Sequence, residues 1–479
     1  MDDGLLASAA RLLAAAPCSV ELPAGTGKTH LLAAAAASAA ADKKRSLVLT
    51  HTNAGVDAIR QRLRQFGVPQ SLVRVDTLTS WAFTLVRSYT TIAEIAVADL
   101  PNWSCSDDYV CGATRVVKAS AISGMLSASF DYLFVDEYQD CSIVQHDFVL
   151  ALSRGVPSAI ILGDPLQAIF TFAGPTVRWE HHVQPVFAPF KTKVEPHRWH
   201  GHNRALGQWL LDARPGLVDG RVFDVGEHAV QGLRYVPAAG NGGLAEVMDR
   251  FRDLDESVVL LDKWPQDVAR HASRLGGSYK VMEDIGGNFM RQELEFMPPE
   301  GSHLLAHWCA TFAKQCMVGL AGLDSPLLAR LKQNKSITHY ARSGIAGVLT
   351  AIDALRSNPT YAEVLSAMRV IQGVTALRIY RWEAWNDTRA AIAMTVENGE
   401  PMSDNLARVR DRLRRSGRVS LKRIASRTLL VKGLEYDHVV IADLERVRDP
   451  RNLYVALSRA RRSVTIVGRT SRITLRDGA

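Results

Sequence analysis

The most specific chemistry in the 479-residue sequence lies near its start, in a glycine-rich segment, residues 23–29, that reads Pro-Ala-Gly-Thr-Gly-Lys-Thr. An Ala- and Leu-rich run, residues 30–41, follows directly and predicts a helix. Backbone N–H groups of such a turn, with the positive end of a following helix, bind phosphate oxygens. The residues expected to hold a nucleotide are Gly25, Thr26, Gly27, Lys28 and Thr29. Lys28 would reach the β- and γ-phosphates, and the Thr29 hydroxyl would bind Mg²⁺.

Two apolar runs farther along end in polar residues that fit the same chemistry. Residues 132–135 lead into Asp136 and Glu137, and residues 159–162 lead into a segment that ends at Gln167. Asp136 could hold the Mg²⁺, and Glu137 could accept a proton from the attacking water. Gln167 could hydrogen-bond the γ-phosphate or its water. An acidic pair after a strand is usually an exposed loop, but together with a phosphate loop it becomes specific.

Other candidate residues carry little information when each is taken alone. Phe170 and Phe172 share one face of an extended segment and suit base stacking, although core packing is the commoner role of such residues. A Lys-Gly-Leu-Glu segment, residues 432–435, precedes one predicted strand, and Arg459 lies just before another. A lone arginine such as Arg198 is usually a surface residue.

The elements that must position these residues are short apolar runs, rich in β-branched residues, that alternate with longer helical segments. The predicted strands are residues 46–50, 73–77, 132–135, 159–162, 258–261, 439–442 and 464–467. Because they are mostly apolar, they predict parallel sheets covered on both faces and an α/β fold class. Two stretches, about 86–125 and 287–405, break this rhythm, and we expect them to be insertions into a two-lobed core, the second mainly helical.

Taken in order, these motifs resemble the UvrD/Rep branch of the superfamily-1 DNA helicases. The segments that carry the resemblance are residues 23–29, 50–53, 77–81, 136–140, 163–167, 197–198, 432–435 and 457–460. The resemblance implies two RecA-like P-loop lobes with parallel sheets and with ATP in the cleft between them. Residues 1–198 would form the ATP-binding lobe, with a small insertion at about 86–125. Residues 199–286 and 406–479 would form the second lobe, and 287–405 a helical accessory lobe.

The resemblance also implies roles for residues that spacing alone does not explain. Arg198 and Arg459 match arginines that reach the γ-phosphate, and Glu435, with Gly433 beside it, matches the residue that binds the ribose. His197 replaces the usual tyrosine and could still stack on adenine. The implied DNA contacts are Thr52, Asn53, Thr77, Trp81, Phe170 and Phe172. Family membership implies ATP and Mg²⁺ as cofactors, single-stranded DNA or a single/double-strand junction as partner, and 3′→5′ movement.

Four features depart from the family pattern. No glutamine precedes Gln61, so the residue that reads adenine is missing, and Ala173 stands where an arginine usually contacts DNA. Residues 427–431 lack the usual histidine, and both insertions are short. We therefore expect an intact ATPase core with reduced unwinding. In size and lobe reduction the chain also resembles the helicase-like subunit of Gabija-type anti-phage systems, which works with a nuclease.

The sequence alone leaves two functions open. One is a motor that couples ATP hydrolysis to movement on DNA. The other is a regulatory subunit that senses ATP or DNA and gates a bound nuclease, with little unwinding of its own. A small-molecule kinase with a phosphate loop does not explain Arg459, residues 432–435 or the aromatic residues.

The formal net charge of +8 is concentrated in one window, residues 408–427, which holds nine basic residues and one acid. Its position before residue 432 favours phosphate contact over a solvated helix face, with Arg412, Arg414, Arg415 and Arg418 as the DNA-binding candidates.

The composition limits the location of the protein and its metal chemistry. The sequence has no apolar run long enough to span a bilayer and no basic signal segment, and its six cysteines fit a reducing cytoplasm. Cys309 and Cys316 lie near His303 and His307, but core packing is a better interpretation than a zinc site.

Overall fold

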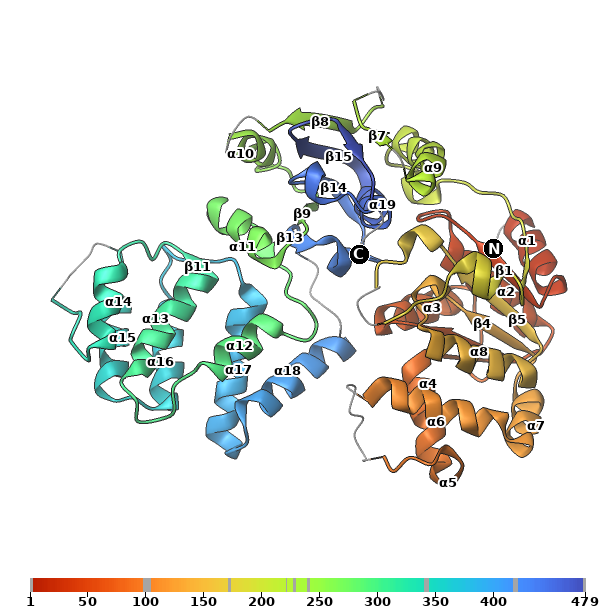
Figure 1. Ribbon diagram of the computed structural model, residues 1–479, viewed down its shortest axis with the longest axis horizontal. Coiled ribbons are helices and arrows are strands. Elements are labelled where there is room, and N and C mark those ends of the chain that lie inside the picture. Colours follow the sequence, from red (N-terminus) through yellow and green to blue (C-terminus); the bar gives the residue numbers. More distant parts are fainter. Residues whose placement is uncertain are drawn as a thin grey trace.

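The protein was analysed as a computed structural model that describes residues 3–97, 105–170, 174–220, 222–226, 230–238, 242–339, 344–416 and 421–476. Figure 1 shows three regions, an α/β region from red to yellow, a second α/β region in green and blue, and a helical region in teal and light blue. We call them the first lobe, the second lobe and the helical lobe. Among the described residues, none of the helices combines the length and the apolarity needed to cross a membrane.

The first lobe is built on a six-stranded sheet in the order β3-β2-β4-β5-β1-β6, in which every pair is parallel. Its strands are β1 (Cys18–Glu21), β2 (Ser46–Thr50), β3 (Val73–Thr77), β4 (Tyr132–Val135), β5 (Ser158–Gly163) and β6 (Ala188–Pro189). Alternate residues of one strand face different cores, since Leu47 and Leu49 lie in one buried cluster and Val48 in another. The sheet is therefore covered on both faces.

Helices from two parts of the chain cover these faces. One face is covered by α1 (Asp3–Ala14), α2 (Lys28–Ala41) and α3 (Asn53–Gln65). The other is covered by α4 (Leu78–Ser88), α5 (Thr90–Ala93), α6 (Ser106–Lys118), α7 (Ser120–Ser129) and α8 (Ile143–Gly155). The described part of the stretch at about 86–125 is thus helical, and it packs on the sheet beside α8.

The second lobe repeats this design, with the sheet order β10-β13-β9-β14-β15-β8 and parallel pairing throughout. Its strands are β8 (Leu233–Pro237), β9 (Val258–Asp262), β10 (Lys280–Val281), β13 (Arg423–Arg427), β14 (Tyr436–Ile441) and β15 (Ala460–Gly468). Its helices are α9 (Arg204–Asp219), α10 (Gly242–Asp249), α11 (Pro265–Arg274) and α19 (Pro450–Leu457), and β7 (Val222–Asp224) pairs with β16 (Arg472–Thr474). Two parallel six-stranded sheets with helices confirm the predicted α/β class and fit two RecA-like lobes.

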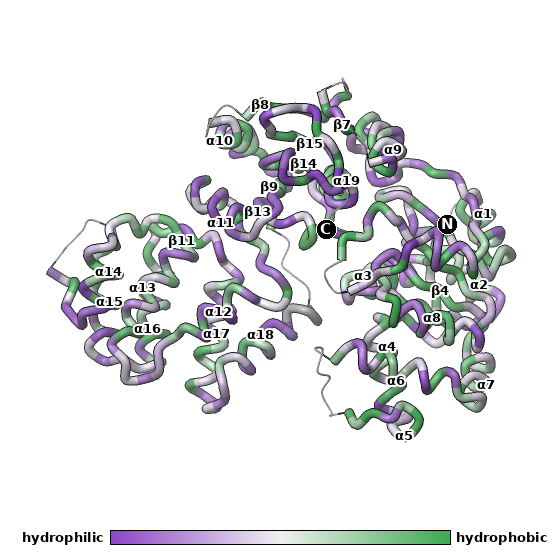
Figure 2. Tube along the Cα trace, viewed as in Figure 1, coloured by the Kyte–Doolittle hydropathy of each residue, from purple (hydrophilic) through white to green (hydrophobic). Residues whose placement is uncertain are grey.

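The helical lobe interrupts the second sheet between β10 and β13. It consists of α12 (Asn288–Glu295), α13 (Leu304–Cys316), α14 (Ser325–Lys332), α15 (Ala346–Ser357), α16 (Tyr361–Gln372), α17 (Trp382–Asn398) and α18 (Met402–Ser416), with β11 (Met317–Val318) paired to β12 (Arg378–Ile379). Hydrophobic and hydrophilic residues are interspersed along these helices (Figure 2), as expected for helices that rest one face on a core. Cys309 and Cys316 are fully buried in that core.

Aromatic rings form the centre of the helical lobe. The Phe312 ring lies 5.3 Å from that of Trp308 and 5.6 Å from that of Trp385, in both cases nearly parallel. Trp385 is fully buried and donates its indole N–H to Gln372 Oε1 at 3.2 Å.

Two buried arginines join the helical lobe to the second lobe. Arg381, just before α17, pairs with Glu283 at 3.0 Å. Arg410 of α18 pairs with Glu383 and Asp387 and also donates to the Asp284 carbonyl at 2.6 Å. Arg410 therefore has a structural role, although it belongs to the basic window.

We expect Trp385→Ala to destabilise the helical lobe by about 3–5 kcal/mol, because it removes the ring at the end of the aromatic stack and leaves a cavity. The matched control is Trp382→Ala on the same helix, where the side chain is 45% exposed, with an expected cost below about 1 kcal/mol. Chemical unfolding followed by circular dichroism measures both. If both variants lost the same free energy of unfolding, the aromatic stack would not be what stabilises this lobe.

Candidate functional site

The glycine-rich loop connects the carboxyl end of β1 to the first turn of α2, which begins at Lys28. Gly25 has a φ of +73°, a left-handed conformation that side chains rarely adopt. A Cβ on Gly25 would lie 2.7 Å from the Trp199 ring, so the backbone approaches that ring too closely for any other residue. The Trp199 ring also presses on Gly207 of α9, where a Cβ would lie 2.6 Å away, and its indole N–H donates to the Ala460 carbonyl at 2.8 Å.

Lys28 has the environment of a phosphate-binding lysine. Its side chain is 7% exposed, and its ammonium, which carries three N–H donors, pairs with one oxygen of the Glu137 carboxylate at 3.1 Å. Burial opposes the charged form, but Glu137, Asp136 and Asp164 outweigh it and raise the pKa of Lys28. A buried cation with unused donors at the mouth of a glycine-rich loop fits an anionic ligand.

The two acids after β4 differ in their surroundings. Asp136 accepts a hydrogen bond from the Thr29 hydroxyl at 3.1 Å, and burial together with Glu137 raises its pKa. Burial acts in the same direction on Glu137, but Lys28 and Lys432 reverse the effect and lower the pKa of Glu137. Glu137 also has a left-handed φ of +56° and accepts from Gln139 at 2.5 Å. The hydroxyl of Thr29 and the carboxylate of Asp136 are oxygen ligands of the kind that Mg²⁺ prefers.

A chain of polar side chains connects this acid pair to the second lobe. The Asp164 backbone N–H donates to Gln139 at 2.9 Å, and the Gln167 amide donates to the Asp164 carboxylate at 2.9 Å. Arg459 then donates to Gln167 Oε1 at 3.0 Å. Arg459 is 1% exposed, and burial together with Arg198 lowers its pKa. Gln167 and Arg459 thus meet directly across the cleft.

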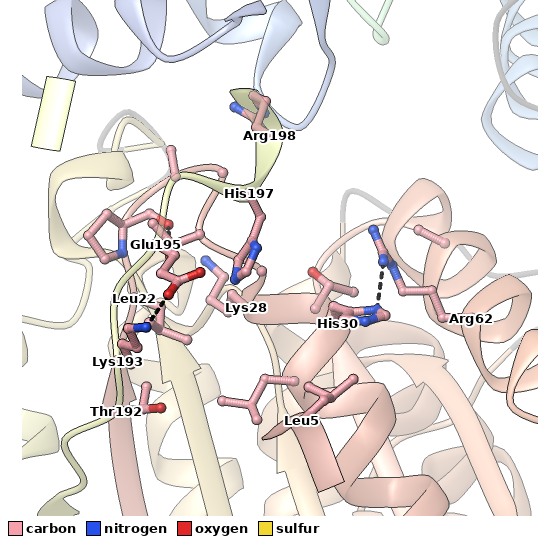
Figure 3. A pocket seen from close by; sticks show the side chains of 18 of the residues that line it. Leu5, Leu22, Lys28, His30, Arg62, Thr192, Lys193, Glu195, His197 and Arg198 are labelled. Atoms are coloured by element: carbon pink, nitrogen blue, oxygen red, sulfur yellow. Dashed lines mark hydrogen bonds and ion pairs between the residues drawn. The ribbon is translucent and has the colours of Figure 1, made fainter. Parts of the chain in front are cut away.

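One cavity of about 840 Å³ is lined by most of the predicted nucleotide-binding residues, and Figure 3 shows Lys28, His197 and Arg198 among its side chains. Its lining includes Gly25, Thr26, Gly27, Lys28, Thr29, Glu137, Gln167, His197, Arg198, Gly433, Glu435 and Arg459. Arg198 donates to Glu435 at 2.9 Å and to the Ser458 carbonyl, so the predicted γ-phosphate and ribose contacts hold one another in place. Asp136 lies behind the cavity, where it meets Thr29.

The predicted adenine contact lies in a cluster that could also bind a metal. His197, Glu195 and His200 bring one possible ligand atom each to within 4.8 Å of one another. However, the Glu195 carboxylate is already paired with Lys193, and both imidazoles are exposed. A cation at this cluster would have to displace the Lys193 ammonium.

The predicted DNA-binding residues are spread along the carboxyl edge of the first sheet. Thr52 and Asn53 are exposed at the start of α3, and Thr77 is buried where it caps α4 by accepting from the Ser80 N–H at 3.1 Å. Trp81 is only partly exposed, because it packs on the core beside Phe130, 6.2 Å away between ring centroids, and under Arg74.

The remaining DNA-binding candidates are described only in part. Phe170 is half-buried, and the Lys432 ammonium lies 5.0 Å from its ring centroid. Arg412 is exposed on α18. Arg414 and Arg415 belong to that helix, but their side chains lie outside the described part of the structure, as do the whole of Phe172, Arg418 and the Ala173 position.

Several residues at the site escaped the sequence analysis. Arg214 of α9 pairs with the buried Asp164 at 2.7 Å and with Glu21 at 2.7 Å. The Ala24 N–H donates to the Tyr454 hydroxyl at 2.9 Å. Arg214 lies in no motif, so no sequence signal could have found it. Asp140 and Lys432 lie inside quoted motifs, but only their pairing across the cleft reveals their role.

The fold and this cleft define a two-lobed P-loop protein, in which Arg459, just before β15 of the second sheet, lines the same cavity as the phosphate loop of the first lobe. Residues 106–182 match the sequence profile of the UvrD/REP helicase N-terminal domain. The chain therefore resembles the UvrD/Rep-type superfamily-1 helicases, as the order of its motifs predicted.

The individual relatives cover the chain unevenly. The ATP-dependent DNA helicase Rep of Buchnera aphidicola subsp. Baizongia pistaciae (strain Bp) is 23% identical over 149 residues, which are 31% of this chain and 20% of that protein. The chain therefore spans only a fifth of the length of this relative in the alignment. The crystal structure of Pif1 helicase from Candida albicans aligns with 98% of this chain and 94% of its own at 12% identity, but the TM-score of 0.40 is too low to define a common fold.

His51, which follows β2, makes a pH-dependent contribution to stability. Its Nε2 lies 3.4 Å from Cys141 Sγ, and burial together with Lys432 lowers its pKa from 6.5 to about 4, against a smaller opposite effect of Glu137. The unfolded chain then binds more protons between these values, so the stability contributed by neutral His51 is present above 6.5 and is lost as the pH falls towards 4. The free energy of unfolding, measured across this range, should fall less steeply in His51→Gln.

The exposed His200 supplies the control, since His200→Gln should leave the pH dependence of the wild type unchanged. If His51→Gln and the wild type follow the same curve, His51 is not held neutral in the folded protein.

Proposed function

We propose that this chain hydrolyses ATP and uses the free energy to move along single-stranded DNA in the 3′→5′ direction, in the cytoplasm, with reduced strand separation. The observation that carries the proposal is the shared cavity, which the buried Lys28 lines together with Arg198 and with Arg459 of the second lobe. The resemblance to UvrD/Rep-type helicases supports DNA as the polymer and ATP as the fuel.

Each residue of the cleft has a role in this proposal. Lys28 and the loop N–H groups bind the β- and γ-phosphates, and Glu137, ionised because Lys28 and Lys432 lower its pKa, accepts a proton from the attacking water. Gln167 orients that water, and Arg459 stabilises charge on the transferring phosphoryl group. Mg²⁺ held by Thr29 and Asp136 would neutralise the phosphate oxygens.

The domain division follows from the same proposal. Residues 1–198 act as the ATP-binding lobe, with the helical stretch at about 86–125 as its insertion. Residues 199–286 and 406–479 act as the second lobe, and 287–405 as the accessory lobe. Gln167 of the first lobe and Arg459 of the second line the same cavity, so a γ-phosphate bound there would contact both lobes. Its loss on hydrolysis would remove these contacts and allow a step along the strand.

A second candidate is an ATP- or DNA-sensing subunit that gates a nuclease partner, as in Gabija-type anti-phage systems. One observation favours it, because Trp81 packs against Phe130 and Arg74 and is only partly available for base stacking. ATPase activity that rises with the length of the DNA strand supports the motor, whereas activity independent of length supports the sensor.

Lys28→Ala and Glu137→Gln should both lower ATP hydrolysis at least about a hundredfold, because one removes the phosphate contact and the other the proton acceptor. Glu137→Gln should still bind ATP and DNA, since its amide keeps the size of the carboxylate. Release of phosphate measures the first effect, and binding of a fluorescent ATP analogue measures the second.

The control for Lys28→Ala is Lys44→Ala, which removes an exposed lysine between α2 and β2. It should keep full activity. Full turnover by Lys28→Ala or Glu137→Gln would refute the roles given to these two residues.

Replacing Arg412, Arg414, Arg415 and Arg418 by glutamine should weaken DNA binding. It should also flatten the salt dependence of binding by about 0.7 in log–log slope for each phosphate that the variant no longer neutralises. The control is a triple glutamine variant of the exposed Lys43, Lys44 and Arg45. They lie at the amino end of β2, whereas the predicted DNA contacts Thr52 and Thr77 lie at the carboxyl ends of strands, so this variant should bind DNA normally. Fluorescence anisotropy over a range of salt concentrations tests both variants. Unchanged affinity and slope would make the cluster a solvated face or a protein-docking patch.

A further inference from the structure

Lys432 connects the two lobes, and the proposed hydrolysis of ATP gives it no direct role. It follows the short helix η7 (Thr428–Val431) of the second lobe, and its ammonium reaches the first lobe. There it donates to both carboxylate oxygens of Asp140 at 2.6 Å and to the Gln167 carbonyl. Lys432 and Asp140 are 8% and 5% exposed. The pair is therefore desolvated, and loss of either charge would leave the other uncompensated.

Asp140 and Gln167, the two partners of Lys432, each end a short helix that follows or contains a residue with a proposed role in hydrolysis. Asp140 closes the 3₁₀ helix η2 (Tyr138–Asp140), which starts directly after Glu137. Gln167 closes the 3₁₀ helix η3 (Pro165–Gln167), and its side chain contacts Asp164 and Arg459. One ammonium from the second lobe thus fixes the ends of two segments that position the proposed proton acceptor and the water-orienting amide.

Lys432 itself lies outside the nucleotide cavity, because it is absent from the lining while Gly433 and Glu435 are present. Its contacts nevertheless reach the site, since Asp140 ends the short helix that starts directly after Glu137, and both Glu137 and Gln167 line the cavity. This geometry does not support direct binding of ATP by Lys432. It supports a role in holding Glu137 and Gln167 in position.

The same ammonium also faces an aromatic ring on the proposed DNA path. It lies 5.0 Å from the ring centroid of Phe170, within the range of a cation–π interaction. Phe170 comes three residues after Gln167 in the chain and is half-buried, so part of its side chain is accessible from outside. Lys432 therefore contacts both Gln167, the proposed water-orienting residue, and Phe170, the predicted base-stacking residue.

We propose that Lys432 is the positioning residue that couples DNA at Phe170 to hydrolysis at Glu137. In the closed cleft its ammonium holds Asp140 and Gln167 in place, and a base that stacks on Phe170 stabilises the ring against which the ammonium rests. DNA thereby favours the arrangement in which Glu137 and Gln167 are aligned. This inference rests on the proposed function, since it assumes an ATPase that DNA stimulates.

The test measures ATPase kinetics of the full chain with and without oligothymidylate. In Lys432→Met we expect the DNA-stimulated kcat to fall about tenfold while the KM for ATP changes less than about twofold, because Lys432 acts through Asp140 and Gln167 and not on the nucleotide. Lys432→Arg, which keeps a cation, should recover part of the stimulation. The matched control is Lys263→Met, which removes another lysine of the second lobe whose ammonium also lies 5.0 Å from an aromatic ring, that of Trp264.

A charge-balanced double variant separates coupling from folding. Lys432→Met with Asp140→Asn leaves no buried unpaired charge, so it should fold even if the single variant does not, and it should still lack DNA stimulation. Normal stimulation in this double variant, or a loss of activity equal with and without DNA, would overturn the inference while leaving the proposed function in place. A wild-type ATPase indifferent to DNA would overturn the proposed function and this inference with it.

Discussion

The structure of the cleft depends on buried positive charge. Lys28 is nearly inaccessible to water, and an ammonium in that environment is stable only where carboxylates compensate it. The compensation comes from Asp136 and Glu137, which follow β4 and reach the loop after β1, because β4, β5 and β1 run parallel and end at the same side of the sheet. Glu137 has a left-handed backbone, and its carboxylate lies 3.1 Å from the Lys28 ammonium. An anionic ligand would accept hydrogen bonds from the remaining N–H groups of the Lys28 ammonium.

Much of this arrangement could be predicted from the sequence, because local patterns encode it. All seven runs proposed as strands overlap strands of the two sheets. Most are apolar because they are buried on both faces, whereas β3, at the edge of the first sheet, carries the exposed Arg74. The strands that escaped prediction are short or polar, such as β10, of two residues, and β13, which begins and ends with arginine. Their pairing in the sheet, and not their composition, makes them strands.

Long-range pairing explains what the sequence could not reveal. Arg214 finds Asp164 only because α9 packs beside the cleft, and no spacing rule connects two residues fifty positions apart. The basic window shows the same effect, since its uniform composition hides different environments. Arg410 is buried among acids of the helical lobe, Arg423 donates to backbone carbonyls of the second lobe, and Arg412 is exposed. Net charge along the chain therefore overstates the charge available to a ligand.

The contacts of Trp199 have a consequence for how this sequence can change over time. Its indole ring fills the space between the phosphate loop at Gly25, helix α9 at Gly207 and the start of β15 at Ala460. No side chain fits on either glycine while the ring is present, and a smaller residue at 199 would leave a cavity beneath the loop. A substitution at Gly25, Trp199 or Gly207 is therefore tolerated only with a matching substitution at another of these positions. Variation at any one of them in a related sequence should be accompanied by compensating variation at the others.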